Sequence, residues 1–230
     1  MFDILTQYWS LFLIGTWPSG PIGGFAATLI LSGLGLGLSF PLAVALALAR
    51  TGQIRWLNVT ATIWVYAFRG IPLITIIFWV YFLLPLMIGT TVPAFGTALA
   101  AIVVYESAFL AEIVRAGLDG IPKGQMEAAR AIGLSYPQAM CSVILPQTLL
   151  SMIPSLLNQF VSTIKATSIV YIIGMQEVTF SAQQITSMEM TRALPVLLVL
   201  AGFYFVACLG LSQFATWLER RINSRQLRTA

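Results

Sequence analysis

The chain has 230 residues, of which 58% are hydrophobic and 9% are charged, and its formal net charge is +4. Its mean hydropathy is +0.89, whereas an ordinary soluble domain carries about 25% charged residues. These values indicate an integral membrane protein. They also exclude a separate soluble domain, because no segment is long and polar enough to form one. Residues 1–230 are therefore predicted to form a single all-α transmembrane domain.

Residue types that are typical of enzymatic sites are scarce. The sequence contains no histidine and no G-x-x-x-x-G-K-[ST] loop, and its two cysteines, Cys141 and Cys208, lie far apart. Metal ligation by His/Cys clusters, a catalytic triad and nucleotide binding by a P-loop each need such residues. We therefore expect a chain that is not an enzyme, holds no metal or cofactor and forms no disulfide.

Residues 1–20 form the first predicted element. The stretch MFDILTQYWSLFLIG is apolar, but it carries Asp3 and has neither a basic start nor a clear cleavage site. These features predict a helix in the membrane interface rather than a signal peptide. A sixth span is the alternative, and it would put both ends of the chain on the same side of the membrane.

Five further runs are long and apolar enough to cross a bilayer, whose hydrocarbon core of about 30 Å needs about 20 apolar residues per helix. They lie near residues 26–49, 71–88, 97–114, 149–173 and 194–218. The predicted fold is a bundle of five transmembrane helices. Gly33 and Gly37, in the first run, have the small-x-x-x-small spacing that permits close helix contacts within or between subunits.

Basic residues mark one side of this bundle. They lie between the first and second runs, between the third and fourth, and after the fifth: Arg50, Arg55, Arg115, Lys123, Arg130, Arg220, Arg221, Arg225 and Arg228. Lys and Arg near the ends of spans are retained in the cytoplasm. The N-terminus is therefore predicted to lie outside, and the basic tail of residues 219–230 inside.

The segment 122–146, between the third and fourth runs, differs from the rest of the chain. Pro122 can open a helix, residues 125–132 are rich in alanine, and Gly133 suits the left-handed position that ends a helix. Ser135, followed three residues later by a glutamine, has the spacing of a capping box that starts a second helix. We expect a cytoplasmic helix–turn–helix elbow, and an ordinary amphipathic connector is the alternative.

The elbow resembles the loop signature of permease subunits of bacterial ABC importers. The matching residues are Glu127-Ala128-Ala129, Gly133, Val143, where isoleucine is usual, and Leu145-Pro146. Four other stretches are similar to the polar amino acid branch of that family: FRGIPL at 68–73, EIVRAG at 112–117, IPKGQ at 121–125, and NQ at 158–159 ahead of KATS at 165–168. The resemblance extends from about residue 27 to residue 185.

The resemblance implies a role for the elbow as a coupling helix that docks in a groove of a cytoplasmic ATPase. Ala128, Ala129 and Ala131 would allow the ATPase to approach closely, Glu127 would supply a charge, and Gly133 would let the chain turn sharply. In such importers two permeases, identical or paralogous, work with two ATPases and an extracytoplasmic binding protein. ATP and Mg²⁺ are then bound by the ATPase partner.

Polar and ionisable residues within the spans are candidates for the solute pathway, because a charge at membrane depth is costly unless it faces a cavity or a partner. They are Glu106, Asn158, Gln159, Thr163, Lys165, Thr167, Ser168 and, near a membrane interface, Arg69. An ion pair between Glu106 and Lys165 is the alternative for these two residues. A simple position at the membrane interface is the alternative for Arg69.

The sequence therefore predicts a permease subunit that translocates polar amino acids across a bacterial inner membrane. The family usually has Lys-Asp-Thr-Ser where this chain has Lys165-Ala166-Thr167-Ser168. Losing that carboxylate makes the site more positive and favours glutamate or aspartate, then glutamine, as does a finer resemblance to acidic amino acid permeases. The alternatives are a permease for methionine, basic amino acids or another solute, a secondary transporter, and a membrane scaffold.

Overall fold

The computed structural model describes residues 2–52 and 54–229, with side chains described as far as residue 221. Arg225 and Arg228 of the predicted basic tail therefore lie outside the described side chains. The described part is almost entirely helical and contains no β-strand. The predicted all-α class is confirmed.

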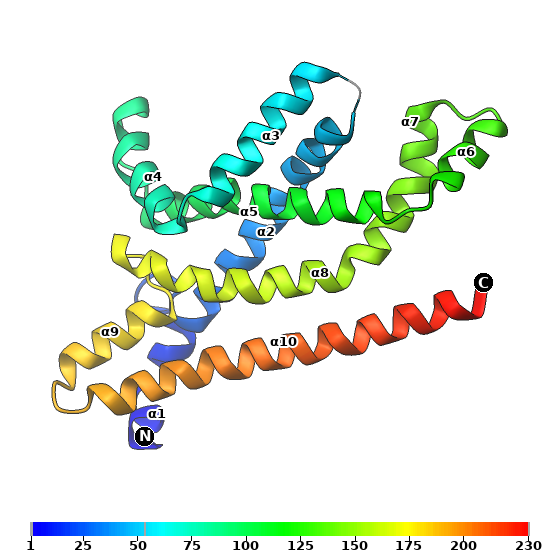
Figure 1. The fold of residues 1–230 in the computed structure, drawn as a ribbon. Helices are drawn as coiled ribbons and strands as arrows, with labels where there is room; N and C mark the ends of the chain where they lie inside the picture. Colours follow the sequence, from blue (N-terminus) through cyan, green and yellow to red (C-terminus); the bar gives the residue numbers. More distant parts are fainter. Residues whose placement is uncertain (1, 53, 230) are drawn as a thin grey trace.

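The helices follow one another through short connections. Their bounds are α1 Phe2–Ile14, α2 Gly24–Thr51, α3 Arg55–Gly70, α4 Leu73–Ile88, α5 Ala94–Asp119, α6 Lys123–Ala131, α7 Tyr136–Ala139, a π-helical turn Met140–Ile144, α8 Leu145–Ala166, a 3-10 turn Thr167–Ile173, α9 Val178–Met188 and α10 Ala193–Thr229. In Figure 1, α5, α8 and α10 extend along the molecule, with the elbow of α6 and α7 at one end and α1 and α9 at the other.

Among the described residues, four helical segments are long and apolar enough to span a membrane: Gly24–Thr51, Ala94–Asp119, Tyr136–Ile173 and Ala193–Arg221. The predicted run 71–88 is α4, whose 16 residues extend only about 24 Å at about 1.5 Å per residue. It reaches span length only together with α3, from which it is bent by 105°. The bend follows from Pro72, which disfavours the helical conformation at Ile71.

The N-terminal helix is too short for a sixth span. α1 has 13 residues and departs from helical geometry at Tyr8, so it extends no more than about 20 Å. Its Tyr8 hydroxyl donates a hydrogen bond of 3.0 Å to Glu189, after α9. α1 therefore packs against the α9 end of the bundle.

Small residues bring α2 and α5 together. Ala43 and Ala47 on α2 are fully buried, and so is Gly35, which approaches Ile102 on α5 so closely that an added Cβ would lie 2.5 Å from the Ile102 Cγ2 atom. Gly33 and Gly37, in contrast, are exposed and contact nothing within 4 Å of such a Cβ. The close contact within this chain is therefore made by Gly35 and by Ala43 and Ala47, which have the same small-x-x-x-small spacing, and not by Gly33 and Gly37.

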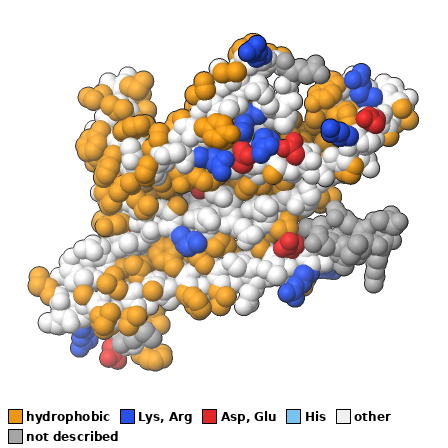
Figure 2. All heavy atoms as spheres, in the orientation of Figure 1, with side chains coloured by type: hydrophobic (Ala, Val, Ile, Leu, Met, Phe, Trp, Pro, Cys, Tyr) orange, Lys and Arg blue, Asp and Glu red, His pale blue; other side chains and the backbone are white. Residues whose placement is uncertain are grey.

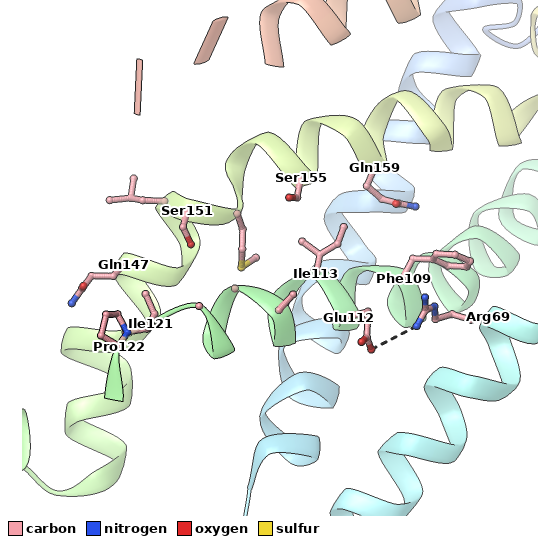
Figure 3. Close-up of a pocket in the computed structure, with 15 residues that line it drawn as sticks. Arg69, Phe109, Glu112, Ile113, Ile121, Pro122, Gln147, Ser151, Ser155 and Gln159 are labelled. Carbon is pink, nitrogen blue, oxygen red and sulfur yellow. Dashed lines mark ion pairs between the residues drawn. The ribbon is translucent and has the colours of Figure 1, made fainter. Parts of the chain in front are cut away.

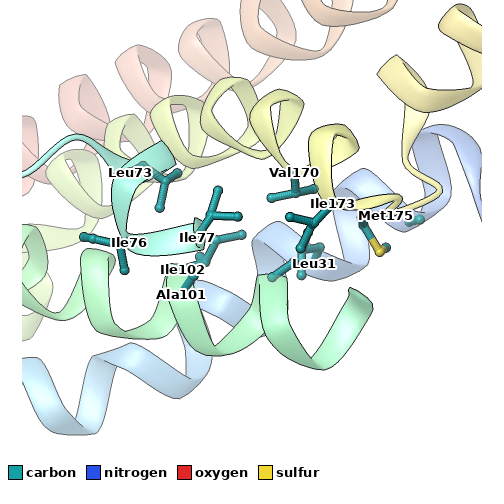
Figure 4. Close-up of a cluster of buried hydrophobic side chains, with 11 residues drawn as sticks. Leu31, Leu73, Ile76, Ile77, Ala101, Ile102, Val170, Ile173 and Met175 are labelled. Atoms are coloured by element: carbon teal, nitrogen blue, oxygen red, sulfur yellow. The ribbon is translucent and has the colours of Figure 1, made fainter. Parts of the chain in front are cut away.

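A hydrophobic cluster joins the broken span to this helix pair (Figure 4). It combines Leu31 of α2, Ile76 and Ile77 of α4, Ile102 of α5 and Val170 of the 3-10 turn, all of them buried. The cluster covers only the first half of α4, whereas the last turns of this helix expose large apolar side chains. The cluster therefore fixes the start of α4 and leaves its end outside the core.

A buried carboxyl fixes the opposite end of the bundle from the elbow. Glu177 is fully buried at the start of α9. Its Oε1 accepts the Phe180 N–H at 2.9 Å, and its Oε2 accepts the hydroxyls of Tyr204 at 3.2 Å and Thr28 at 3.4 Å. Burial raises the pKa of Glu177 to about 7. Glu177 therefore fastens α9 to α2 and α10.

Two glycine substitutions test the contact between α2 and α5. Gly35→Ala is expected to lower stability by about 1–3 kcal/mol, because the new methyl group would lie 2.5 Å from Cγ2 of the buried Ile102 and force the core to shift. Gly37→Ala, two residues along the same helix, should be neutral or slightly stabilising, because its Cβ meets open space. Thermal unfolding of the purified protein in detergent measures both, and equal melting temperatures would contradict the close approach.

Candidate functional site

A cavity of about 810 Å³ lies between α5 and α8. One wall is formed by α5 residues that include Phe109, Glu112 and Ile113, and the other by polar α8 residues that include Ser155 and Gln159 (Figure 3). The cavity extends to the loop that enters the elbow. Of the residues predicted for the solute pathway, Arg69 and Gln159 line it.

Charged side chains meet at the base of the α5 wall. Glu112 accepts hydrogen bonds from Arg50 of α2 at 2.6 Å and from Nε of Arg115 at 3.1 Å, and Arg115 also reaches Asp119 at 2.6 Å. Arg69, at the end of α3, brings a third guanidinium within 3.7 Å of the same carboxylate. Figure 2 shows basic side chains gathered toward this part of the molecule and the elbow. The ends of three helices are thus held together by one acidic residue.

Glu106 does not form an ion pair with Lys165. It is buried in α5, where Oε2 accepts the side-chain amide of Gln159 at 2.8 Å and Oε1 accepts the hydroxyl of Thr163 at 2.9 Å. The alternative of a pair with Lys165 is therefore wrong. Glu106 and Thr163 connect α5 to α8, and Gln159 alone of the three reaches the cavity.

The outward face of α8 carries a stripe of polar side chains. Ser151, Ser155, Asn158, Ser162 and Lys165 are all exposed and recur at intervals of four and three residues. This places them on one side of a helix along about 21 Å, most of the thickness of a hydrocarbon core. We call these five residues the polar stripe. Lys165 makes no ion pair with any residue that the structure describes.

The sequence interpretation included only two residues of the polar stripe, Asn158 and Lys165, and it missed the three serines. The signal was present, because polar residues at a spacing of four and three define one helical face just as apolar ones do. Thr167 and Ser168 are not part of the stripe. The Thr167 hydroxyl is buried and bonds to the Ile164 carbonyl, and the Ser168 hydroxyl bonds to the Lys165 carbonyl.

The elbow is a helix–turn–helix, as predicted. Pro122 caps α6, Gly133 ends it with a φ of +93°, and the Ser135 N–H donates a hydrogen bond of 2.9 Å to Gln138 Oε1 at the start of α7. A positive φ is strained for any residue with a Cβ, so Gly133 makes the turn possible. The side chain of Gln138 satisfies a backbone donor that the helix start leaves without a partner.

Exposure divides the alanines of α6. Glu127, Ala128 and Ala131 face solvent, whereas Ala129 is only 4% exposed and packs into the chain. Of the three alanines expected to let the ATPase approach closely, Ala128 and Ala131 are therefore the ones open to direct contact. Ile132 is 80% exposed at the tip of the elbow, beside Gly133. The sequence interpretation missed this residue, because an apolar side chain at a helix end carries no signal of its own.

Leu145 and Pro146 connect the elbow to the polar stripe. Just before them, Met140–Ile144 forms a π-helical turn, in which the Leu145 N–H bonds to the carbonyl of Met140, five residues earlier. Proline clashes with the carbonyl four residues before it and offers no N–H, so Pro146 favours this wider turn. The structure is thus helical without a break from α7 to the stripe.

Residues 35–224 match the family described as binding-protein-dependent transport system inner membrane component. The chain belongs to this family. It is 35% identical over 206 residues to the inner membrane amino-acid ABC transporter permease protein YhdY of Escherichia coli (strain K12), which covers 88% of this chain and 56% of that protein. It is 36% identical over 200 residues to the probable glutamine ABC transporter permease protein GlnP of Bacillus subtilis (strain 168), covering 86% and 91%.

A solved structure agrees with this assignment. An amino acid ABC transporter crystallised with histidines superimposes on the permease with a TM-score of 0.82 at 31% identity, covering 96% of this chain and 98% of that one. The protein is therefore a multi-pass inner membrane permease of the amino acid ABC transporter class. This is the class that the elbow signature predicts.

Proposed function

We propose that the permease translocates polar amino acids through a pathway formed by the polar stripe and the adjoining cavity. The observation that carries the proposal is the stripe itself. A lysine, an asparagine and three serines on one face of a membrane-spanning helix are costly against lipid. They are satisfied if this face lines a water-filled path between two permeases, which opens alternately to each side.

The energy for this cycle comes from a separate ATPase that binds the elbow. Glu127, Ala128 and the apolar tip at Ile132 are exposed there and offer the ATPase a charge, a flat contact and an anchor. The ATPase supplies the site for ATP and Mg²⁺, and a binding protein outside the membrane delivers the solute. A second permease, identical or paralogous, completes the pathway.

The variant Gly133→Asp tests the docking role of the elbow. It should leave the membrane bundle folded but reduce receptor-stimulated ATP hydrolysis in liposomes at least about tenfold, because it strains the turn and adds a charge at the docking surface. Gly124→Asp is the matched control, since it adds the same charge to α6 without a positive φ or a close neighbour. Wild-type stimulation in the Gly133 variant would contradict the docking role.

The proposed orientation places the elbow inside the cell and α9 outside. Cysteines introduced at Lys123 and at Gln183, both exposed, should react from opposite sides of the membrane in a background without Cys141 and Cys208. The check is labelling with an impermeant maleimide in intact and then in opened cells. Labelling of both positions in intact cells would refute the orientation.

Among polar amino acids, we propose glutamate and aspartate first. The support is Lys165, which is exposed on the polar stripe and has Ala166 where the family usually has a carboxylate. A cation that faces the path without an ion-pair partner among the described residues favours an anionic group on the solute. Glutamine is the second candidate, because a relative of this permease is named for glutamine.

The variant Lys165→Gln tests this preference. It should weaken glutamate uptake about 10- to 100-fold, the value of a charge-assisted hydrogen bond, while binding to the receptor stays unchanged. Ala166→Asp should act in the same direction, and glutamine uptake is the internal control that both variants should spare. A wild-type transporter that takes up arginine or histidine in preference to glutamate would contradict the electrostatic argument.

A further inference from the structure

Three guanidinium groups, those of Arg50, Arg69 and Arg115, surround the carboxylate of Glu112 at the cavity. Each oxygen of Glu112 already accepts a hydrogen bond, Oε2 from Arg50 and Oε1 from Arg115. Arg69 approaches the same carboxylate only to 3.7 Å and donates no hydrogen bond to any residue that the structure describes. Its charge is therefore attracted to the cluster while its N–H donors remain available.

Arg69 is nevertheless held in a defined place. It lies in the last turn of α3 and lines the cavity, its guanidinium lies 5.6 Å from the centre of the Phe109 ring, and 37% of its side chain is exposed. Stacking on an aromatic ring orients the planar guanidinium group. Arg69 is thus presented to the cavity, and the neutralisation of Glu112 does not depend on it.

The opposite wall offers a complementary group. Figure 3 shows Gln159 on α8 and Arg69 on α3 at opposite walls, with Phe109 between them. The Gln159 amide nitrogen donates to Glu106, so the hydrogen-bond network fixes the orientation of this side chain. Its Oε1 is then left as an acceptor, which suits an ammonium group. The cavity therefore presents a carboxylate-binding donor on one wall and an ammonium acceptor on the other.

We propose that Arg69 binds the α-carboxylate of the transported amino acid in this cavity, with Gln159 Oε1 accepting from its α-ammonium group. The inference rests on the proposed function and narrows it. A guanidinium forms two parallel hydrogen bonds to a carboxylate, which a point charge does not. Because every amino acid carries the same two groups, this subsite selects amino acids as a class and does not read their side chains.

Binding of amino acids and their α-amides to the permease–ATPase complex, without the binding protein, tests the subsite. The probes are L-glutamate, L-glutamine and the analogue of each in which the α-carboxyl is a carboxamide. In the wild type the α-amides should bind about 10- to 100-fold more weakly, because they lose the charge-assisted hydrogen bonds. In Arg69→Gln the affinity for the amino acids should fall to the affinity for the α-amides, and the affinity for the α-amides should not fall further.

The control is Arg55→Gln, which removes the same charge from the exposed start of α3 and should bind all four probes like the wild type. Arg69→Lys keeps the charge but loses the two parallel donors of the guanidinium, so its affinity for the amino acids should lie between those of the wild type and Arg69→Gln. If the Arg69 variants do not fold, the wild-type comparison still decides, since α-amides that bind as tightly as the amino acids overturn the subsite. If the wild type transports amino acids and Arg69→Gln binds them as tightly as the wild type, the subsite is overturned and the proposed function stands. If the wild type neither binds nor transports any amino acid, the proposed function is overturned as well.

Discussion

The free-energy cost of placing polar groups in the hydrocarbon core of a membrane constrains how the helices of this structure pack. Each such group must find a partner within the protein or face water. Glu106 finds two partners on α8, in Gln159 and Thr163, and so fixes the distance between α5 and α8. The cavity lies beside this contact, and residues of both helices line it.

The same constraint gives α8 two different polar faces. Gln159 and Thr163 turn inward and are satisfied by Glu106, whereas Asn158 and Lys165 turn outward and are exposed. An inward polar face can serve stability alone. An outward one needs water or a second subunit, and for this reason the polar stripe, rather than the buried carboxyl, carries the functional proposal.

The elbow and the stripe belong to one helical segment. α7, the π-helical turn and α8 lie within the continuous span Tyr136–Ile173, so the two candidate functional regions are joined without an intervening loop. At the other end of the molecule, Glu177 fastens α9 to α2 and α10.

The sequence by itself determined the all-α membrane class, the elbow with its turn at Gly133 and the family, because hydropathy, capping residues and the elbow signature are local properties of the chain. Only the tertiary structure decided the partners of Glu106, the exposure of Lys165 and the 3.7 Å approach of Arg69 to Glu112. Residues far apart in sequence become neighbours only through the packing of α3, α5 and α8. A side chain's partner depends on that packing, which no local pattern records.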